Sequence, residues 1–239
     1  MLTGCAGSPP PHGDGPSSSN AMVGKAHVIR QHGDLGLIAT NALDKSLTIS
    51  AIAGHRWSEL YGIGMPDGLD QEVLVDGGTI HTGGFADLVY TAEQPGDLAV
   101  DFLAYAFVGR WRTIRVPAQV RSFSELETFV AGQVPTNTDA VFRLDAEVAH
   151  LRWFVVGGMG NGQPDHRSSF ARSRILGGFD RRRISAVGFL LPNRLGSATS
   201  PSAPMHVHFR TTDAGDLFVG HLDGELALLP GATLYVADE

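Results

Sequence analysis

The stretch MHVHFRTTDAGDLFVGH, residues 205–221, holds three of the ten histidines of this chain. His206 and His208 are two positions apart, so in a β-strand both side chains point to the same face, about 7 Å apart. A hairpin turn centred on Ala214-Gly215 would pair His208 with His221. Directly opposed residues of an antiparallel pair share a face, with Cβ atoms about 5 Å apart. The spacing therefore predicts three imidazoles that converge from two adjacent strands.

Three imidazole nitrogens with an open fourth position are typical of a catalytic zinc site. The spacing does not select zinc, because imidazoles also bind Fe, Ni, Cu and Co. The alternative interpretation is three polar side chains on a half-exposed sheet face, and the third histidine in register favours the metal. A cupin site would need a glutamate soon after the second histidine, and residues 209–214 contain none.

The sequence around this hairpin is rich in strand patterns. We expect one or two strands in residues 139–156, one in 182–192, and a closing meander through 205–210, 217–222, 225–229 and 233–237. The segment from Gly157 to Arg174 is predicted to be a long loop because it is rich in Gly, Ser and Arg.

The first half of the chain mixes helix and strand signals. Residues 46–64 have apolar side chains at roughly helical spacing, and residues 72–81 predict a hairpin with its turn at the Asp-Gly-Gly sequence. Residues 97–108 predict a buried strand. Ser122 with Glu125 three residues later predicts the start of a helix that ends near Gly132.

These elements predict an α+β fold with two β-rich halves, mixed or antiparallel sheets and a few helices. The expected division is a tail over residues 1–22, an N-terminal half over 23–140, and a C-terminal half over 141–239 that carries the histidines.

Composition narrows the classes of partner. The formal net charge is −7, so nucleic acid and anionic membranes are not expected partners. No apolar run is long enough to cross a bilayer, so no transmembrane segment is expected. The only lysines are Lys25 and Lys45, near the N-terminus, which argues against imine chemistry in the site.

The single cysteine, Cys5, ends the sequence LTGC at residues 2–5, which resembles a bacterial lipobox. The Pro-, Gly- and Ser-rich residues that follow it suit a flexible tether. Only Met1 precedes this motif, however, so the apolar region of a signal peptide is absent. Two localisations stay open: an exported lipoprotein anchored through Cys5, or a cytoplasmic protein.

Five segments in order along the chain, between Ser46 and Leu226, resemble the α-acetolactate decarboxylases. LYGIGMPDGLDQEVLVDGGTIH is similar to the glycine-rich and LDGE-containing stretch of that family, and SFSELETFVAGQVPTNTDAVFRLDA to its helix followed by NLFYAIRIDG. ISAVGFLLP, MHVHF and VGHL are similar to its GTIVGFLTP, YHLHF and GGHV.

The resemblance implies a β-rich fold with Zn²⁺, or another divalent transition metal, bound by His206, His208 and His221. It places an active-site glutamate on Glu72 and an arginine on Arg152, with Arg143 as the alternative. The implied reaction converts 2-acetolactate to acetoin with loss of CO₂, the metal acting as a Lewis acid on the substrate's carbonyl and hydroxyl oxygens. The expected partners are a small hydroxy-keto acid and, in a homodimer, a second copy of the chain.

The sequence departs from the family pattern at two places in the site. The family's threonine falls on Met65, and its active-site glutamate in the C-terminal tail has no counterpart, because 18 residues follow His221 and we do not assign that role to Glu239. A zinc-dependent ester hydrolase and a non-catalytic metal- or ligand-binding lipoprotein therefore remain alternative functions.

Each supporting residue also has a structural interpretation. Glu72 suits a solvated surface carboxylate, and Arg152 could stack on an aromatic ring among its apolar neighbours. Arg181 to Arg183 are expected to be a solvated strand entrance, and His81, His150 and His166 are isolated along the sequence.

Overall fold

The computed structural model describes residues 28–38, 46–67, 71–84, 98–156, 174–213 and 218–238. Cys5, the tail over residues 1–22, His166 and the predicted turn at Ala214-Gly215 lie outside these ranges. Within them, no helix is both long and apolar enough to cross a membrane.

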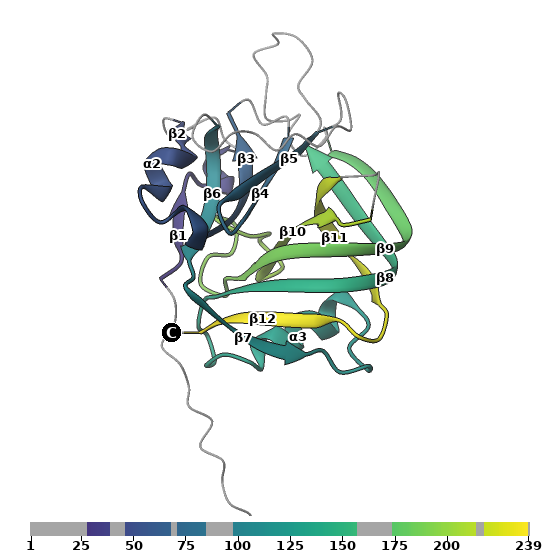
Figure 1. Ribbon diagram of the computed structural model, residues 1–239. Helices are drawn as coiled ribbons and strands as arrows, with labels where there is room; N and C mark the ends of the chain where they lie inside the picture. Colours follow the sequence, from purple (N-terminus) through teal and green to yellow (C-terminus); the bar gives the residue numbers. More distant parts are fainter. Residues whose placement is uncertain are drawn as a thin grey trace, which may run out of the picture.

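Sheet A is built from the first part of the chain and contains six antiparallel strands. They are β1 (Arg30–His32), β2 (Leu47–Thr48), β3 (Leu60–Pro66), β4 (Gln71–Asp76), β5 (Thr79–Gly84) and β6 (Ala99–Phe107). The order is β1-β6-β3-β4-β5, and β2 also pairs with β6. Figure 1 shows this sheet at the upper left of the molecule.

Sheet B follows from residue 110 onward and also contains six antiparallel strands. They are β7 (Arg110–Arg115), β8 (Ala140–Val156), β9 (Arg174–Leu190), β10 (Met205–Thr211), β11 (Val219–Leu228) and β12 (Thr233–Asp238). The order is β11-β10-β9-β8-β12-β7. Because β11 also pairs with β8, four of these strands, β8 to β11, form a closed ring.

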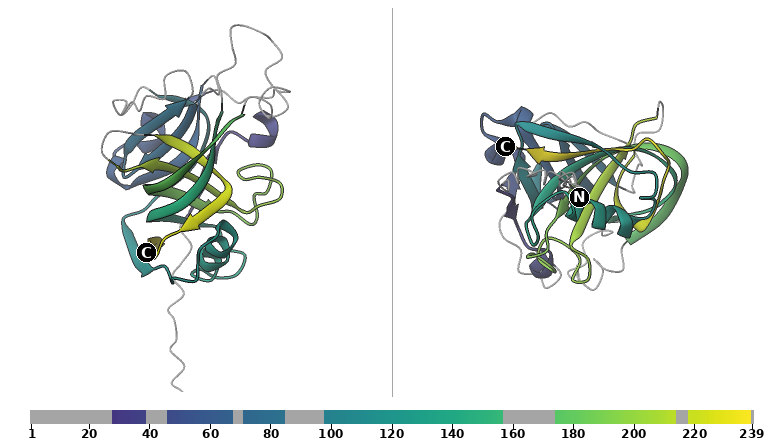
Figure 2. Two further views of the ribbon diagram at one scale, coloured as in Figure 1. Left: turned by 90° about the vertical axis from the view of Figure 1, so that its right-hand side faces the viewer. Right: turned by 90° about the horizontal axis from the view of Figure 1, so that it is seen from below.

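The helices within the described residues are few and short. They are α1 (Leu35–Ile38), α2 (Ile49–Ala53), the 3₁₀ turn η1 (Trp57–Glu59) and α3 (Phe123–Ala131). Figure 2 shows α3 against sheet B, where Leu126 and Val130 bury their side chains in the core. The predicted α+β fold with two β-rich parts and few helices is confirmed, and all ladders between the named strands are antiparallel.

The capping box predicted for α3 is present. The Ser122 hydroxyl accepts a hydrogen bond from the Glu125 N–H, and the Glu125 carboxylate accepts one from the Ser122 N–H. Gly132 caps the other end of the helix.

The helix predicted over residues 46–64 is wrong in its second half. Only α2 and η1 are helical, and β3 begins at Leu60. All seven residues of β3 are buried, because sheet A is packed on both of its faces at this strand. The apolar residues of β3 therefore do not alternate with polar ones.

Strands β8 and β9 form one long hairpin rather than separate short strands, with Ala140 opposite Leu190 and Val156 opposite Arg174. Two glycines of β9 make room for aromatic rings. A Cβ on Gly177 would lie 2.2 Å from the ring of Trp153, and a Cβ on Gly188 would lie 2.2 Å from the ring of Phe142. These glycines therefore reflect cross-strand packing.

The long hairpin changes face near its middle. Its ladder omits Ala149 and Arg181, and Arg181 has a φ of +48°. Before this point Phe142 and Leu144 join the main core of sheet B, whereas after it Leu151 joins that core. The shift from even to odd positions explains why a period of two does not run through β8.

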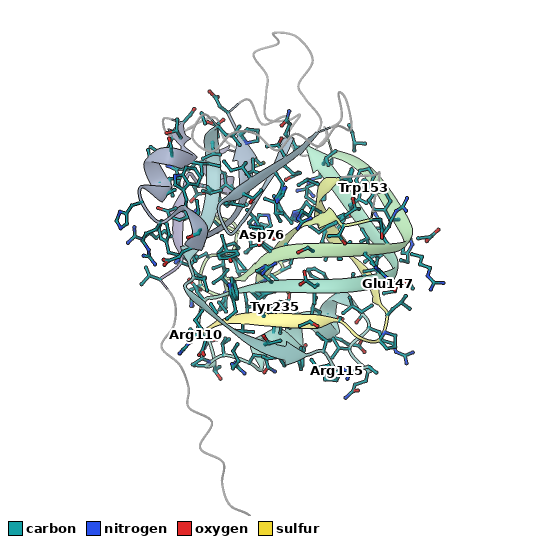
Figure 3. The ribbon with its side chains drawn as sticks, in the orientation of Figure 1. Asp76, Arg110, Arg115, Glu147, Trp153 and Tyr235 are labelled. Atoms are coloured by element: carbon teal, nitrogen blue, oxygen red, sulfur yellow. The ribbon has the colours of Figure 1, made fainter. Side chains whose placement is uncertain are left out.

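A second apolar core lies between the two sheets. Ile63 and Phe102 of sheet A pack in one cluster with Val141 and Phe189 of sheet B, and all four are at most 1% exposed. Asp76, labelled in Figure 3, adds an ion pair across this junction, with its Oδ1 at 3.0 Å from Arg143 Nε.

Candidate metal centre

The three histidines converge as the spacing predicts. His208 lies directly opposite His221 in the ladder of β10 and β11, and His206 lies two residues before His208 on β10. One nitrogen from each ring lies within 4.8 Å of the other two, so this cluster could hold a metal ion. His206 and His208 are 7% and 1% exposed, so the alternative of half-exposed sheet histidines is wrong for these two.

Backbone carbonyls fix the orientation of two of the rings. His206 Nδ1 donates to the carbonyl of Ala198 (2.7 Å), and His208 Nδ1 donates to the carbonyl of Val73 (2.8 Å). In a neutral imidazole the other nitrogen then carries the lone pair. This arrangement is typical of metal-binding histidines, whose second nitrogen bonds a backbone carbonyl or carboxylate.

The histidine pKa values favour neutral rings. Burial lowers the pKa of His206 to about 4 and lowers those of His208 and His221 well below their usual value. The Nε2 atoms of His206 and His208 lie 3.1 Å apart. With both Nδ1 atoms protonated, two lone pairs face each other at this distance, which is unfavourable unless a proton or a metal ion lies between them. A tetrahedral metal with bonds of about 2.1 Å would separate its nitrogen ligands by about 3.4 Å. The residues therefore fit a metal ion.

Glu72 lies beside the cluster and is 2% exposed, unlike the surface carboxylate of the structural interpretation. Its Oε1 accepts a hydrogen bond from the Val156 N–H (3.0 Å), and its Oε2 lies 3.4 Å from His208 Nε2. Burial raises the pKa of Glu72 to about 8, against the opposing effects of the Val156 N–H and the charge of Arg174. Burial therefore favours the protonated form of this carboxyl.

Arg152 does not line the cavity that contains the histidines. Its guanidinium pairs with Asp223 (3.2 Å) and Glu225 (3.1 Å) on β11. Arg143, the alternative, is likewise absent from the cavity lining and pairs with Asp76.

Among the residues that the structure describes, Arg174 is the arginine that lines the cavity, and sequence reasoning missed it. Its guanidinium lies 4.3 Å from the centre of the Phe154 ring, and that ring stacks on His221 at 4.1 Å. None of the described carboxylates forms an ion pair with it. The sequence analysis assigned Arg174 to the predicted loop from Gly157 to Arg174, whereas in the structure Arg174 is the first residue of β9. The rest of that predicted loop lies outside the described residues. Extending the strand back to Arg174 would have placed it opposite Val156.

Three further candidates from the sequence that the structure describes, His81, His150 and Arg181, do not line the cavity. His81 is buried in sheet A, and His150 Nδ1 lies 2.8 Å from Asp180 on the surface of sheet B. Arg181 is 80% exposed and pairs with Glu147, as expected for a solvated residue.

The cavity has a volume of about 470 Å³ and lies between the two sheets and the ends of α1 and α3. Its polar lining includes Glu72, Arg174 and the three histidines. Its apolar lining includes Leu35, Met65, Phe102, Phe123, Phe154, Val156, Met205 and Leu222.

Two solved structures of acetolactate decarboxylases are similar to this protein along most of its chain. The α-acetolactate decarboxylase of Bacillus subtilis strain 168 superposes with a TM-score of 0.72 at 20% identity, over 88% of this chain and 85% of that one. The fold is that of acetolactate decarboxylase. The acetolactate decarboxylase of Bacillus subtilis subspecies spizizenii gives 0.69 at 20% identity, over 88% and 86% of the two chains.

A Staphylococcus aureus protein of unknown function, described as similar to α-acetolactate decarboxylase, also shares the fold. Its TM-score is 0.69 at 18% identity, over 88% of this chain and 85% of that one. No protein-family model and no curated protein sequence matches the chain. At these identities the similarity establishes the fold, and function must be argued from the site.

Proposed function

We propose that this protein is a metal-dependent decarboxylase that converts 2-acetolactate to acetoin and CO₂. The observation that carries the proposal is the pair of facing Nε2 atoms of His206 and His208, held by two backbone carbonyls beside the buried Glu72. The shared fold with acetolactate decarboxylases supports it.

The reaction breaks the bond between the carboxylate carbon and the carbinol carbon. The bonding electrons stay on the remaining fragment as an enediolate, which then takes a proton on carbon. Zn²⁺ held by the three histidines would supply a Lewis acid for the substrate's carbonyl and hydroxyl oxygens. The rest of the chemistry falls to the protein's own side chains.

Two residues suit the remaining roles. Arg174 holds a fixed positive charge at the cavity, where it can bind the substrate carboxylate and stabilise negative charge. Glu72 can serve as the proton donor to carbon: its Oε1 accepts the Val156 N–H, which leaves Oε2, on the side of His208, free for the proton that is transferred. Arg152 stays a prediction for the arginine role, and a pair of variants described below separates it from Arg174.

The first experiment measures metal content and acetoin production on the same samples. Wild type is compared with His208→Ala, and His150→Ala serves as control because His150 is a surface histidine. We expect near-stoichiometric zinc and acetoin in wild type and in the control, and loss of both in His208→Ala.

Two outcomes contradict the proposal. If the wild-type protein binds no metal, even after reloading with zinc, the proposed metal centre is ruled out. Zinc without acetoin removes the decarboxylase, and ester turnover that disappears with a chelator would then identify the hydrolase alternative.

A further inference from the structure

The cavity is larger than acetolactate requires. Its volume of about 470 Å³ lies within the range of pockets that enclose drug-sized ligands, roughly 300–1,000 Å³. Acetolactate carries only a methyl and an acetyl group beside its carboxylate and hydroxyl. Between the described residues, the remaining space can accommodate a further part of the ligand or hold water.

The surface beside the metal ligands is apolar, which disfavours water. We call Met65, Phe102, Phe154 and Val156 the apolar wall; they are 4%, 0%, 7% and 1% exposed, and all line the cavity. Met65 and Phe102 lie opposite each other in the ladder of β3 and β6, so sheet A supplies one side of the wall. Phe154 and Val156 supply the other side from β8 of sheet B.

The apolar wall begins directly at the histidines. The ring of Phe102 stacks on His206 with centres 6.1 Å apart, and the ring of Phe154 stacks on His221 at 4.1 Å. A ligand whose oxygens face the histidines would therefore have its carbon substituents against these side chains.

Resting on the proposed function, we propose that the substrate is a hydroxy-keto acid whose apolar substituent is larger than methyl, an alkyl chain or a phenyl group. Met65 is then a specificity-determining residue. Its unbranched thioether side chain adapts to irregular apolar shapes and offers no hydrogen-bond donor. Burial of each added methylene against such a surface should raise affinity about fourfold.

The test measures binding, separately from turnover. Calorimetry on the zinc-loaded full chain compares two unreactive α-hydroxy acids, α-hydroxyisobutyrate and atrolactate, in which a phenyl group replaces one methyl. We expect atrolactate to bind at least about tenfold more tightly. Equal affinities, or tighter binding of the smaller acid, would overturn the inference.

Variants locate the preference. Met65→Thr shortens the side chain and adds a hydroxyl, so it should lower the affinity ratio toward one. Met65→Leu keeps the apolar volume and should retain the ratio. Leu176→Thr, on an exposed position of β9 outside the cavity lining, should leave the ratio unchanged. An unchanged ratio in Met65→Thr would contradict the role of Met65.

Turnover separates this inference from the proposed function. Acetolactate is compared with its homologue in which butyl replaces the methyl group, and CO₂ release is measured. Release from acetolactate with no gain for the homologue overturns the larger substrate and leaves the decarboxylase intact. Tighter binding of atrolactate without CO₂ from either acid overturns the decarboxylase, while the preference of the cavity stands.

Discussion

Arg174 and Arg152 lie on the neighbouring strands β9 and β8 but contact different partners. Arg174 lines the cavity, whereas Arg152 is held by Asp223 and Glu225. A charged hydrogen bond to a substrate carboxylate contributes about 1.5–3 kcal/mol, or roughly tenfold to a hundredfold. We expect Arg174→Gln to lower kcat/KM for acetolactate by about that factor, and Arg152→Gln to lower it less than about threefold. The opposite order in steady-state kinetics would assign the role to Arg152.

The proposed role of Glu72 as proton donor requires a carboxyl group, which glutamine lacks. Glu72→Gln keeps a partner for the Val156 N–H but removes the acidic proton, so kcat should fall by about a hundredfold or more. Zinc content should stay near that of wild type, because three histidines remain. Metal analysis and kcat on one preparation check both points, and loss of zinc with activity would instead make Glu72 part of the metal centre.

At this scale the sequence predicted the residues whose spacing carries geometric meaning. The three histidines follow from strand periodicity, and Glu72 came from the resemblance alone, since nothing in QEVLVD shows that its side chain is buried. Arg174 was not predictable in this way. The glycines after it weaken the strand signal. These glycines are needed because rings from the neighbouring strand β8 cover them, and the local sequence does not show that contact.

Among the elements, the β8–β9 hairpin has a specific steric requirement. In Gly177→Ala the new methyl group would lie 2.2 Å from the Trp153 ring, whereas at Gly178 the nearest atom, the carbonyl oxygen of Leu151, lies at 3.2 Å. Both changes reduce the flexibility of the unfolded chain equally. We expect Gly177→Ala to lower the free energy of unfolding by about 1–3 kcal/mol relative to Gly178→Ala. Denaturant titration of the two variants measures the difference, and equal stabilities would show that the ring moves aside freely.

Local signals predicted the elements well where both the cause and the effect lie within a few residues. The capping box of α3 and the pairing of His208 with His221 are confirmed. The prediction of a helix over residues 46–64 was wrong in its second half, because β3 is buried on both faces and its sequence therefore lacks the alternation that marks a strand. The predicted strands at 217–222 and 225–229 run together as one strand, β11, whose ladder with β8 contains register shifts.

For the whole molecule, buried histidines set the response to acid. Burial lowers the pKa of His81 to about 4, with a further effect of the Arg210 charge, against 6.5 in the unfolded chain. As pH falls below 6.5, His81 binds a proton in the unfolded chain but not in the folded protein. The contribution of His81 to stability is therefore fully present above pH 6.5 and is lost progressively toward pH 4.

The prediction concerns metal-free protein, in which all variants share the same histidine cluster. Between pH 7 and pH 5, His81→Gln should lose about 1–2 kcal/mol less stability than wild type. The exposed His55→Gln serves as control. Denaturant titrations at the two pH values provide the comparison, and an equal loss in all three proteins would count against a buried neutral His81.

The overall class was predictable, since many strand patterns with few helices indicate β-rich sheets. The closure of β8 to β11 was not. The pairing of β11 with β8 joins residues 67 to 80 positions apart, and no local pattern selects the partner of a strand at that separation. The packing of sheet A against sheet B also depends on contacts between residues far apart in the sequence.

The carbonyl of Val73 has one further consequence. His208 belongs to sheet B, but the group that orients it belongs to sheet A. Parting of the two sheets would free this imidazole to turn, and a bound ion would then be exposed to competitors. The rate at which a strong chelator removes the bound ion would thus measure how often the two sheets separate transiently while the strands themselves stay folded.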